Sequence, residues 1–179
     1  MLELGQVDYA ELPIESYLSH VRKQWGENVQ IVKSKAKNVF SFQNGLFLNI
    51  RRTIFNSVRV RHALQMLLNR NLLSQQFLGG EGVLATGPWN RFNEYADSNV
   101  EPIAFSPEQA QKILAEEGWK DSDKNGILDK MIDGKKREFE FKVFYPTDQM
   151  QKFFIIYQMD LRRVGIRMDM QFLDWNLFL

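Results

Sequence analysis

Cysteine is absent from this 179-residue sequence, which excludes disulfide bonds, thiol catalysis and cysteine-ligated metal sites. Histidine is scarce: His20 and His62 lie in separate helical patterns, and neither has a second ligand at metal-binding spacing. No apolar run approaches the roughly 18 residues of a membrane-spanning helix. The opening residues, MLELGQ, lack the basic and then apolar order of a signal peptide. Thiol chemistry, histidine-based metal sites and membrane-spanning helices are therefore not expected.

Strong charge of one sign is also missing. Lys and Arg number 23 against 22 for Asp and Glu, a net charge of +1, so neither nucleic acid nor an anionic membrane is an expected partner. What is present is an ordinary globular composition, 44% hydrophobic and 25% charged, over a length that suits one domain or slightly more. Aromatic residues make up 13%, which predicts a dense core or a ligand-lining surface.

The clearest structural pattern is a strand–helix–strand unit over residues 137–173. Apolar residues alternate from Glu138 to Tyr145, which predicts a strand, and Thr147 then caps a helix with three- and four-residue apolar spacing. Gly165 has the position of a left-handed C′ residue, and a second alternating stretch runs from Ile166 to Phe172. Such a βαβ unit has parallel strands and a right-handed crossover. The fold class is therefore expected to be α/β, a mixed sheet flanked by helices.

Turn and cap residues divide the rest of the chain into shorter elements. The patterns predict a helix from Ile14 to Trp25, a strand at 29–32, a helix opened by Ser57, a second opened by Asn69 or Asn71 and closed by Gly79-Gly80, a helix with a capping box at Ser106–Gln109, and a hairpin at Asp133-Gly134. Residues 39–50 look like a strand interrupted by Asn44-Gly45. That pair predicts either a tight hairpin or a bulge in one long strand, and local turn chemistry favours the hairpin.

One stretch resembles a calcium-binding loop. Asp121, Asp123, Asn125 and Gly126 have the alternating oxygen ligands and the glycine of such a loop, and Asp129 occupies its ninth position. The twelfth position, where a bidentate glutamate is needed, is Ile132. The alternative is a plain turn in which the carboxylates accept hydrogen bonds from backbone amides. The missing ligand favours the plain turn, and no resident metal or cofactor is expected.

Residues 79–102 have no periodicity but contain aromatic side chains. Trp89, Asn90 and Tyr95 combine aromatic surface with polar tips, which suits a ligand cleft. Trp89 could equally fasten the loop to the core, and the residues alone do not decide between these two roles. No Ser-His-Asp arrangement, HExxH motif or phosphate-binding glycine loop can be assembled, so an enzyme is not expected.

Taken in order, several segments resemble a known family, the bacterial extracellular solute-binding proteins of the oligopeptide, dipeptide and nickel type, which are receptors of ABC importers. The resemblance rests on Leu48-Asn49, Phe55–Leu64, Leu68–Arg70, Leu78–Gly80, Ala85–Pro88, Ser106–Ala110, Leu114–Trp119, Asp121–Ile127, Leu161–Ile166 and Leu173–Trp175. No single segment is specific, but their order and spacing match the family over about residues 38–179. The sequence departs from the family pattern at Asn56 and Asn69, where aspartate is usual, and at Ile54, where proline is usual.

The resemblance implies a type II periplasmic-binding-protein-like lobe that closes on its ligand by hinge motion. Residues 1–37 would link from a preceding lobe, and residues 38–179 would form most of the C-terminal ligand-binding lobe, truncated at its C-terminus. In the family the Leu48-Asn49 stretch belongs to one strand, which argues against a hairpin at Asn44-Gly45, and the Asp121 turn is a plain turn. The acidic residue that pairs with a peptide's amino terminus would lie beyond Leu179.

The function that the resemblance implies is binding of peptides in an interlobe cleft and their delivery to a membrane permease. Asn49, Trp89, Asn90 and Tyr95 are the expected ligand-binding residues, with no catalytic residue and no metal. The protein is expected to be a monomer that is periplasmic or lipid-anchored at the cell surface. Alternatives are a receptor for a nickel chelate, haem or sugar, and the sensor domain of a transcriptional regulator built on the same lobe.

Overall fold

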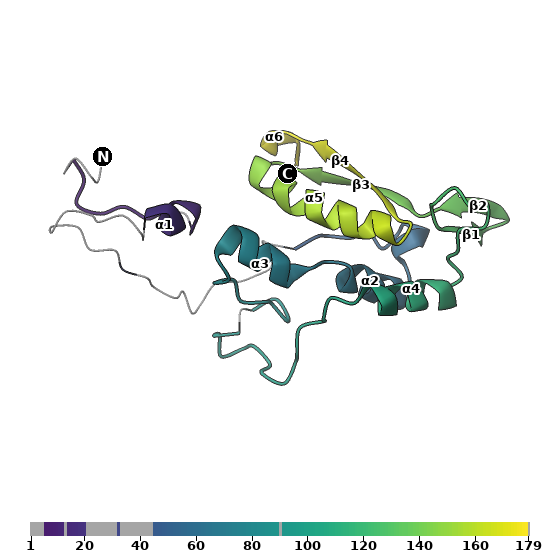
Figure 1. The fold of residues 1–179 in the computed structure, drawn as a ribbon, viewed down its shortest axis with the longest axis horizontal. Helices are drawn as coiled ribbons and strands as arrows, with labels where there is room; N and C mark the ends of the chain where they lie inside the picture. Colours follow the sequence, from purple (N-terminus) through teal and green to yellow (C-terminus); the bar gives the residue numbers. More distant parts are fainter. Residues whose placement is uncertain (1–5, 13, 21–31, 33–44, 90, 179) are drawn as a thin grey trace. The chain divides into compact units, whose positions relative to one another are not determined.

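The computed structural model describes residues 6–12, 14–20, 32, 45–89 and 91–178 (Figure 1). The chain divides into two compact units, which are described separately. Unit 1 comprises Met1–Asn44 and Asn71–Glu101, and unit 2 comprises Gly45–Arg70 and Pro102–Leu179. None of the described helices is long and apolar enough to cross a membrane.

The predicted βαβ unit is confirmed and forms the centre of unit 2. Strand β3 (Glu140–Tyr145) pairs in parallel with β4 (Arg167–Phe172), in register from Glu140 opposite Arg167 to Tyr145 opposite Phe172. Helix α5 (Asp148–Arg163) connects them, and the Thr147 side chain accepts a hydrogen bond from the Met150 N–H as its N-cap. Alternate residues of β3 are buried, because the helices cover only one face of the strand pair.

The predicted hairpin at Asp133-Gly134 is also confirmed. Strands β1 (Asp129–Ile132) and β2 (Lys135–Glu138) are antiparallel, and both turn residues have positive φ, 51° and 71°, as a type I′ turn requires. The sequence predicted one strand from Glu138 onward, but the chain changes sheets at Phe139. The Phe139 N–H donates to the Leu128 carbonyl, whereas its carbonyl accepts from the Arg167 N–H on the opposite side. Phe139 therefore joins two separate two-stranded sheets.

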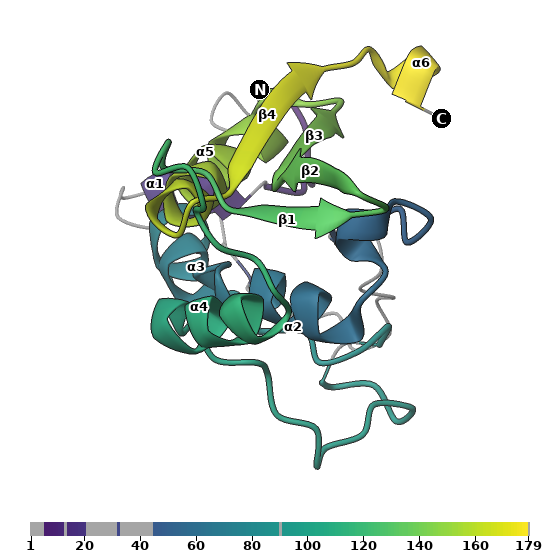
Figure 2. The same cartoon turned by 90° about the vertical axis from the view of Figure 1, so that its right-hand side faces the viewer.

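Two helices pack beneath the strands of unit 2. After a short 3-10 turn, η2 (Thr53–Phe55), helix α2 (Val58–Met66) begins at its predicted N-cap, because the Ser57 side chain accepts from the Val60 N–H. Helix α4 (Pro107–Glu116) lies beside α2 (Figure 2). Its predicted capping box is wrong, since the Ser106 side chain makes no cap hydrogen bond. The Ser106 N–H, which a capping box would give to Gln109, donates instead to the Met66 carbonyl at 2.9 Å.

The core of unit 2 lies between these helices and the strands. The Tyr157 hydroxyl of α5 donates to the Leu64 carbonyl of α2 at 2.9 Å, in a fully buried position. Aromatic contacts join the layers: the Trp119 and Phe139 ring centroids are 4.5 Å apart, and those of Phe55 and Phe141 are 5.2 Å apart. The predicted apolar stripes of α2, α4 and α5 all contribute buried residues.

Residues 45–49 differ from the predicted strand. They are not in a hydrogen-bonded strand, although their exposure still alternates: Leu46 and Leu48 pack against the core, and Phe47 is 71% exposed. Within the described residues these five have no ladder partner, so the alternating pattern determines which side chains face inward without fixing a strand. Residues 39–44, and with them the choice between hairpin and bulge at Asn44-Gly45, lie outside the described residues.

The described helices of unit 1 are α1 (Ile14–His20) and, after its first residue, α3 (Arg70–Leu78). Helix α1 is the described part of the predicted helix at 14–25, and residues 21–25 lie outside the described residues. Of the strand predicted at 29–32, the structure describes only Val32, so this prediction is not tested. Helix α3 begins directly after Asn69 and ends at Gly79 and Gly80, both at positive φ as predicted. A Cβ at Gly79 would lie 2.7 Å from the Leu18 side chain, so α1 lies against the end of α3. The described residues from 81 to 101 form no helix or extended sheet, as predicted.

Candidate functional site

Two of the predicted ligand-binding residues contact each other in unit 1. The Trp89 and Tyr95 rings are tilted by 47°, with centroids 5.6 Å apart, and Tyr95 is 70% exposed. The buried Asn93 shapes this loop, because its side chain accepts from the Tyr95 N–H and its carbonyl accepts from the Ala96 N–H. A half-buried Trp89 beside an exposed Tyr95 offers a surface for stacking or apolar contact. Asn90 lies outside the described residues.

The fourth predicted residue, Asn49, belongs to unit 2. Its side-chain Oδ1 accepts from the Arg51 N–H at 3.1 Å, and its carbonyl accepts from the Arg52 N–H at 3.0 Å. These bonds form the turn that leads into η2, so part of the hydrogen-bonding capacity of Asn49 is used locally. The side chain remains exposed, which leaves its amide group accessible to a ligand.

A further aromatic group, which sequence reasoning missed, lies at the carboxyl end of the β3–β4 pair. The Tyr145 ring packs edge-on against Phe172 at 5.9 Å and against Phe154 at 6.3 Å. Phe172 is 53% exposed, and Trp175, in the short helix α6 (Trp175–Phe178), is 51% exposed. Figure 1 places α6 at this end and the β1–β2 hairpin at the other. In open α/β sheets ligands bind outside the carboxyl ends of the strands, so this end is the expected site.

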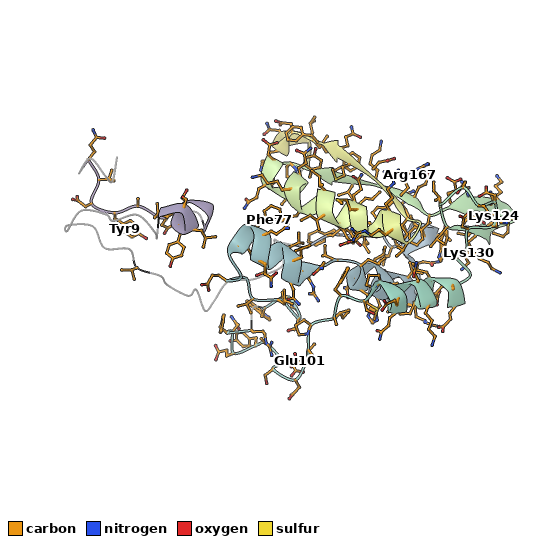
Figure 3. All side chains as sticks on the ribbon, viewed as in Figure 1. Tyr9, Phe77, Glu101, Lys124, Lys130 and Arg167 are labelled. Carbon is orange, nitrogen blue, oxygen red and sulfur yellow. The ribbon has the colours of Figure 1, made fainter. Side chains whose placement is uncertain are left out.

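The opposite, amino-terminal end of the strand pair carries a hollow of about 250 Å³. It is lined by the start of α2, by Trp119 and by β1 with its turn. The Lys130 ammonium group lies over the Trp119 ring at 6.0 Å, beside this hollow, and Figure 3 labels Lys130 at that end of unit 2. The position at the amino ends of the strands does not suit the usual ligand crevice of an α/β sheet.

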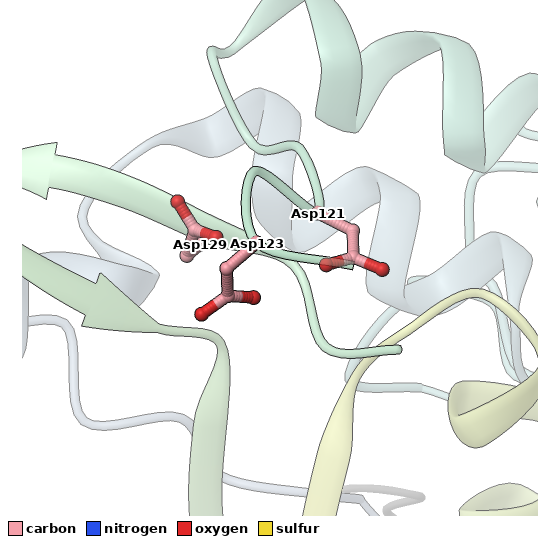
Figure 4. A group of neighbouring side chains, drawn as sticks. All are labelled: Asp121, Asp123 and Asp129. Atoms are coloured by element: carbon pink, nitrogen blue, oxygen red, sulfur yellow. The ribbon is translucent and has the colours of Figure 1, made fainter. Parts of the chain in front are cut away.

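The acidic loop brings together Asp121, Asp123 and Asp129, whose carboxylates lie within 4.8 Å of one another (Figure 4). The Asp121 carboxylate accepts from the Asn125 N–H at 3.0 Å and from the Gly126 N–H at 2.9 Å. These bonds form the plain Asx turn that was the alternative to a calcium loop. The oxygen atoms therefore already have donors from the chain itself.

The other two carboxylates of the loop also have donors. The buried Asp129 accepts from the Ser122 N–H at 2.9 Å and from the Ser122 hydroxyl at 2.8 Å. Asp123 forms an ion pair with Lys136 of β2, and the hydrogen bond from this ammonium group lowers the pKa of the Asp123 carboxyl. A lysine thus supplies the positive charge that the acidic loop needs, which favours the plain turn over a calcium site.

The outer face of the β3–β4 pair is charged. Arg167, which Figure 3 labels, forms ion pairs with Glu140, directly opposite on β3, and with Glu138. Lys142 and Asp169 are the next pair in register, and both are exposed. Opposite charges across a strand pair stabilise it modestly and keep this face hydrated. Phe144, 44% exposed, is the described apolar residue of β3 on this otherwise charged face.

Comparison with known proteins gives the family. The model of the bacterial extracellular solute-binding proteins, family 5 Middle, matches residues 1–179. The oligopeptide-binding protein AppA of Bacillus subtilis is 28% identical over 177 residues, which cover 98% of this chain and 31% of AppA. A probable ABC transporter-binding protein of Deinococcus radiodurans is 29% identical over 69% of the chain and 21% of its own length. The chain therefore spans about a third or less of the relatives that it matches.

Solved structures agree in fold. The structure of AppA from Bacillus subtilis in complex with a nonapeptide matches 73% of this chain and 26% of its own, with a TM-score of 0.65 and 28% identity. NikZ from Campylobacter jejuni in complex with Ni(L-His) matches 97% of this chain and 33% of its own, with a TM-score of 0.71; at 20% identity this likeness concerns the fold alone. The fold is that of a type II periplasmic-binding-protein lobe. The chain belongs to the bacterial extracellular solute-binding proteins of family 5.

Proposed function

We propose that this chain is part of the substrate-binding component of an ABC importer, which binds peptides in an interlobe cleft and delivers them to a membrane permease. The observation that carries the proposal is the family match over the whole chain, together with a curated oligopeptide-binding relative at 28% identity. Binding is non-catalytic in this proposal. Residues 1–37 act as the link from a preceding lobe, and residues 38–179 form most of the C-terminal lobe.

The proposed ligand contacts are Asn49, Trp89, Asn90 and Tyr95, with Phe172 and Trp175 added from the carboxyl end of the strand pair. Exposed aromatic rings beside polar side chains suit peptides, because apolar contact is tolerant of sequence and the polar groups meet the peptide backbone. The receptor acts as a monomer in the periplasm or at the cell surface on a lipid anchor. Size-exclusion chromatography with light scattering tests the monomer.

The test is to purify the protein that contains this chain from its native source, without added ligand, and to release its bound molecules by denaturation. Mass spectrometry is expected to find a mixture of short peptides. The structure of NikA from Brucella suis in complex with Fe(III)-EDTA, 26% identical to this chain, makes a metal chelate the second candidate. A chelate, haem or sugar as the only released molecule would overturn the peptide proposal and leave the importer proposal standing.

The sensor domain of a transcriptional regulator is the other candidate from the sequence. It receives less support, because the named relatives are binding proteins of the oligopeptide and ABC-transporter kind. The sequence around this chain in its gene separates the two. A signal sequence with a lipid-attachment cysteine supports the receptor, and a helix-turn-helix module supports the regulator.

A further inference from the structure

The excursion, as we call the part of unit 1 formed by Asn71–Glu101, leaves unit 2 at Arg70 and returns to it at Pro102. It carries the Trp89–Tyr95 pair. Two hydrogen bonds of unit 2 join the chain just before the excursion to the chain just after it. The Ser106 N–H donates to the Met66 carbonyl at 2.9 Å, and the Arg70 guanidinium Nη2 donates to the Ile103 carbonyl at 2.7 Å.

These two bonds differ in what holds their partners together. Met66 and Ser106 end one helix and precede another, and α2 and α4 pack together independently of this bond. The bond between Arg70 and Ile103 lies nearer the excursion and depends on one side chain. Arg70 is partly buried, and burial lowers the pKa of its guanidinium. A charged donor to a carbonyl contributes more than a neutral one, and more still where water is partly excluded.

We propose that Arg70 is a positioning residue for ligand binding, which holds the two ends of the excursion together and thereby fixes how the Trp89–Tyr95 pair is presented. This inference rests on the proposed peptide-binding function. Closing a long loop has an entropic cost that the contacts at its base must offset. Without the guanidinium, the base of the excursion loses its hydrogen bond to the Ile103 carbonyl and keeps the bond between Ser106 and Met66, so the segment between them gains freedom.

The chain offers a matched control in Arg61. Its guanidinium Nη1 donates to the carbonyls of Phe55 at 2.7 Å and Asn56 at 2.9 Å, so it is also partly buried and bound to backbone oxygens. Both of its acceptors lie within its own stretch of unit 2 and do not span the excursion. Arg61→Met and Arg70→Met therefore each remove a partly buried guanidinium that donates to backbone carbonyls and keep a similar stem volume. They differ in which segments lose their hydrogen bonds.

Hydrogen–deuterium exchange measured by mass spectrometry on the 179-residue chain tests the positioning. Arg70→Met is expected to speed exchange of the amides of residues 83–101 on the order of tenfold, the factor for one lost hydrogen bond from a charged donor. Arg61→Met is expected to affect residues 53–61 and leave 83–101 unchanged. Equal effects of both variants on 83–101, or none from Arg70→Met, would overturn the proposal. Arg70→Leu, which also removes the donor, serves if Arg70→Met does not fold.

A second measurement separates this proposal from the proposed function. In the longer receptor, titration with a nonapeptide is expected to show weaker binding for Arg70→Met and Trp89→Ala, and unchanged binding for Arg61→Met. Faster exchange in 83–101 with unchanged affinity in Arg70→Met overturns the positioning role. Unchanged affinity in Trp89→Ala overturns the assignment of the Trp89–Tyr95 pair as a ligand contact, and the exchange data still judge the role of Arg70 at the base of the excursion.

Discussion

Asp160 of α5 is the least satisfied buried polar residue described. It is 6% exposed; its Oδ1 accepts from Arg163 at 3.0 Å, whereas its Oδ2 has no hydrogen-bond partner in the structure. Burial raises the pKa of the Asp160 carboxyl, and the nearby Arg163 offsets this only in part. A buried carboxylate with one unpaired oxygen is a source of instability when it is ionised.

Asp160→Asn is therefore expected to raise the free energy of unfolding at neutral pH. Because the folded-state pKa is raised, the proton stabilises the folded state fully below the ordinary Asp range, and this contribution is lost as pH rises through the folded pKa. The advantage of Asn should therefore appear at neutral pH and disappear in acid. Urea unfolding across this pH range measures it. Asp148→Asn, in the first turn of the same helix, should instead lower the free energy of unfolding at neutral pH, because a negative charge there interacts favourably with the helix dipole.

Calcium is expected to leave the melting temperature of the chain unchanged, because the three loop carboxylates already bind backbone amides, Ser122 and Lys136. Thermal unfolding with calcium and with a chelator tests this. Asp129→Ala provides the positive control for the assay, since loss of the Ser122 bonds should destabilise the chain by about 1–3 kcal/mol. A calcium-dependent rise in the melting temperature that Asp129→Ala removes would instead show that the loop binds calcium.

At the scale of elements, two helices end in the same way. After α4 and α5, Gly118 and Gly165 have φ of 87° and 82°, and the next residue donates its N–H five residues back, from Trp119 to Leu114 and from Ile166 to Leu161. Both ends are Schellman motifs. They differ in their surroundings, since a Cβ at Gly165 would lie 3.1 Å from the Leu128 side chain and 3.3 Å from the Gly126 carbonyl oxygen.

This difference gives a matched pair of variants. Gly118→Ala should destabilise the chain by about 1 kcal/mol through its backbone conformation alone, because its Cβ would meet only the flexible Lys130 side chain, at 3.5 Å. Gly165→Ala should lower the free energy of unfolding by at least about 1 kcal/mol more than Gly118→Ala does, because the loop around Gly126 and Leu128 must move away from the new methyl group. Chemical denaturation of both variants measures the difference. Equal losses would show that the loop accommodates the methyl group freely.

Local patterns in the sequence predicted these elements well where local physics determines them. The caps at Ser57 and Thr147, the turn at Asp133-Gly134 and the glycine at 165 all follow from short-range chemistry. Two predictions were wrong for a tertiary reason. The Ser106 N–H bonds to Met66, forty positions earlier in the chain. At Phe139 the N–H bonds to Leu128 whereas the carbonyl bonds to Arg167, so the chain passes from one sheet to the other. A single sequence carries no signal for partners that distant.

The candidate site was predictable only in part. An aromatic loop without periodicity pointed to Trp89 and Tyr95, which do contact each other. The Tyr145–Phe172 group was missed because both residues were assigned to the apolar faces of strands, where core packing explains them equally well. The observation that would have found it is the parallel pairing itself, since it brings the two strand ends to the same edge.

At the scale of the whole molecule, the chain covers 31% of the length of AppA. In the proposed receptor the peptide is enclosed by walls that this chain supplies only in part. If the proposed receptor encloses its peptide between two lobes, the 179-residue chain is expected to bind a nonapeptide far more weakly than the longer receptor does. Calorimetric titration of both proteins measures this, with Trp89→Ala as the control for specific binding. Micromolar affinity in the short chain would contradict the expectation.

The hydrogen bond between Arg70 and Ile103 brings together the two places where the chain leaves and rejoins unit 2. This arrangement has a consequence for how members of the family can differ from one another. Where a segment enters and leaves a fold at one place, its length and sequence can change while the remainder keeps its packing. The stretch between Arg70 and Pro102 is then an exchangeable cassette on a constant frame. If the Trp89–Tyr95 pair contacts the ligand as proposed, grafting the corresponding stretch of another family member onto this frame is expected to transfer ligand preference without redesigning the core.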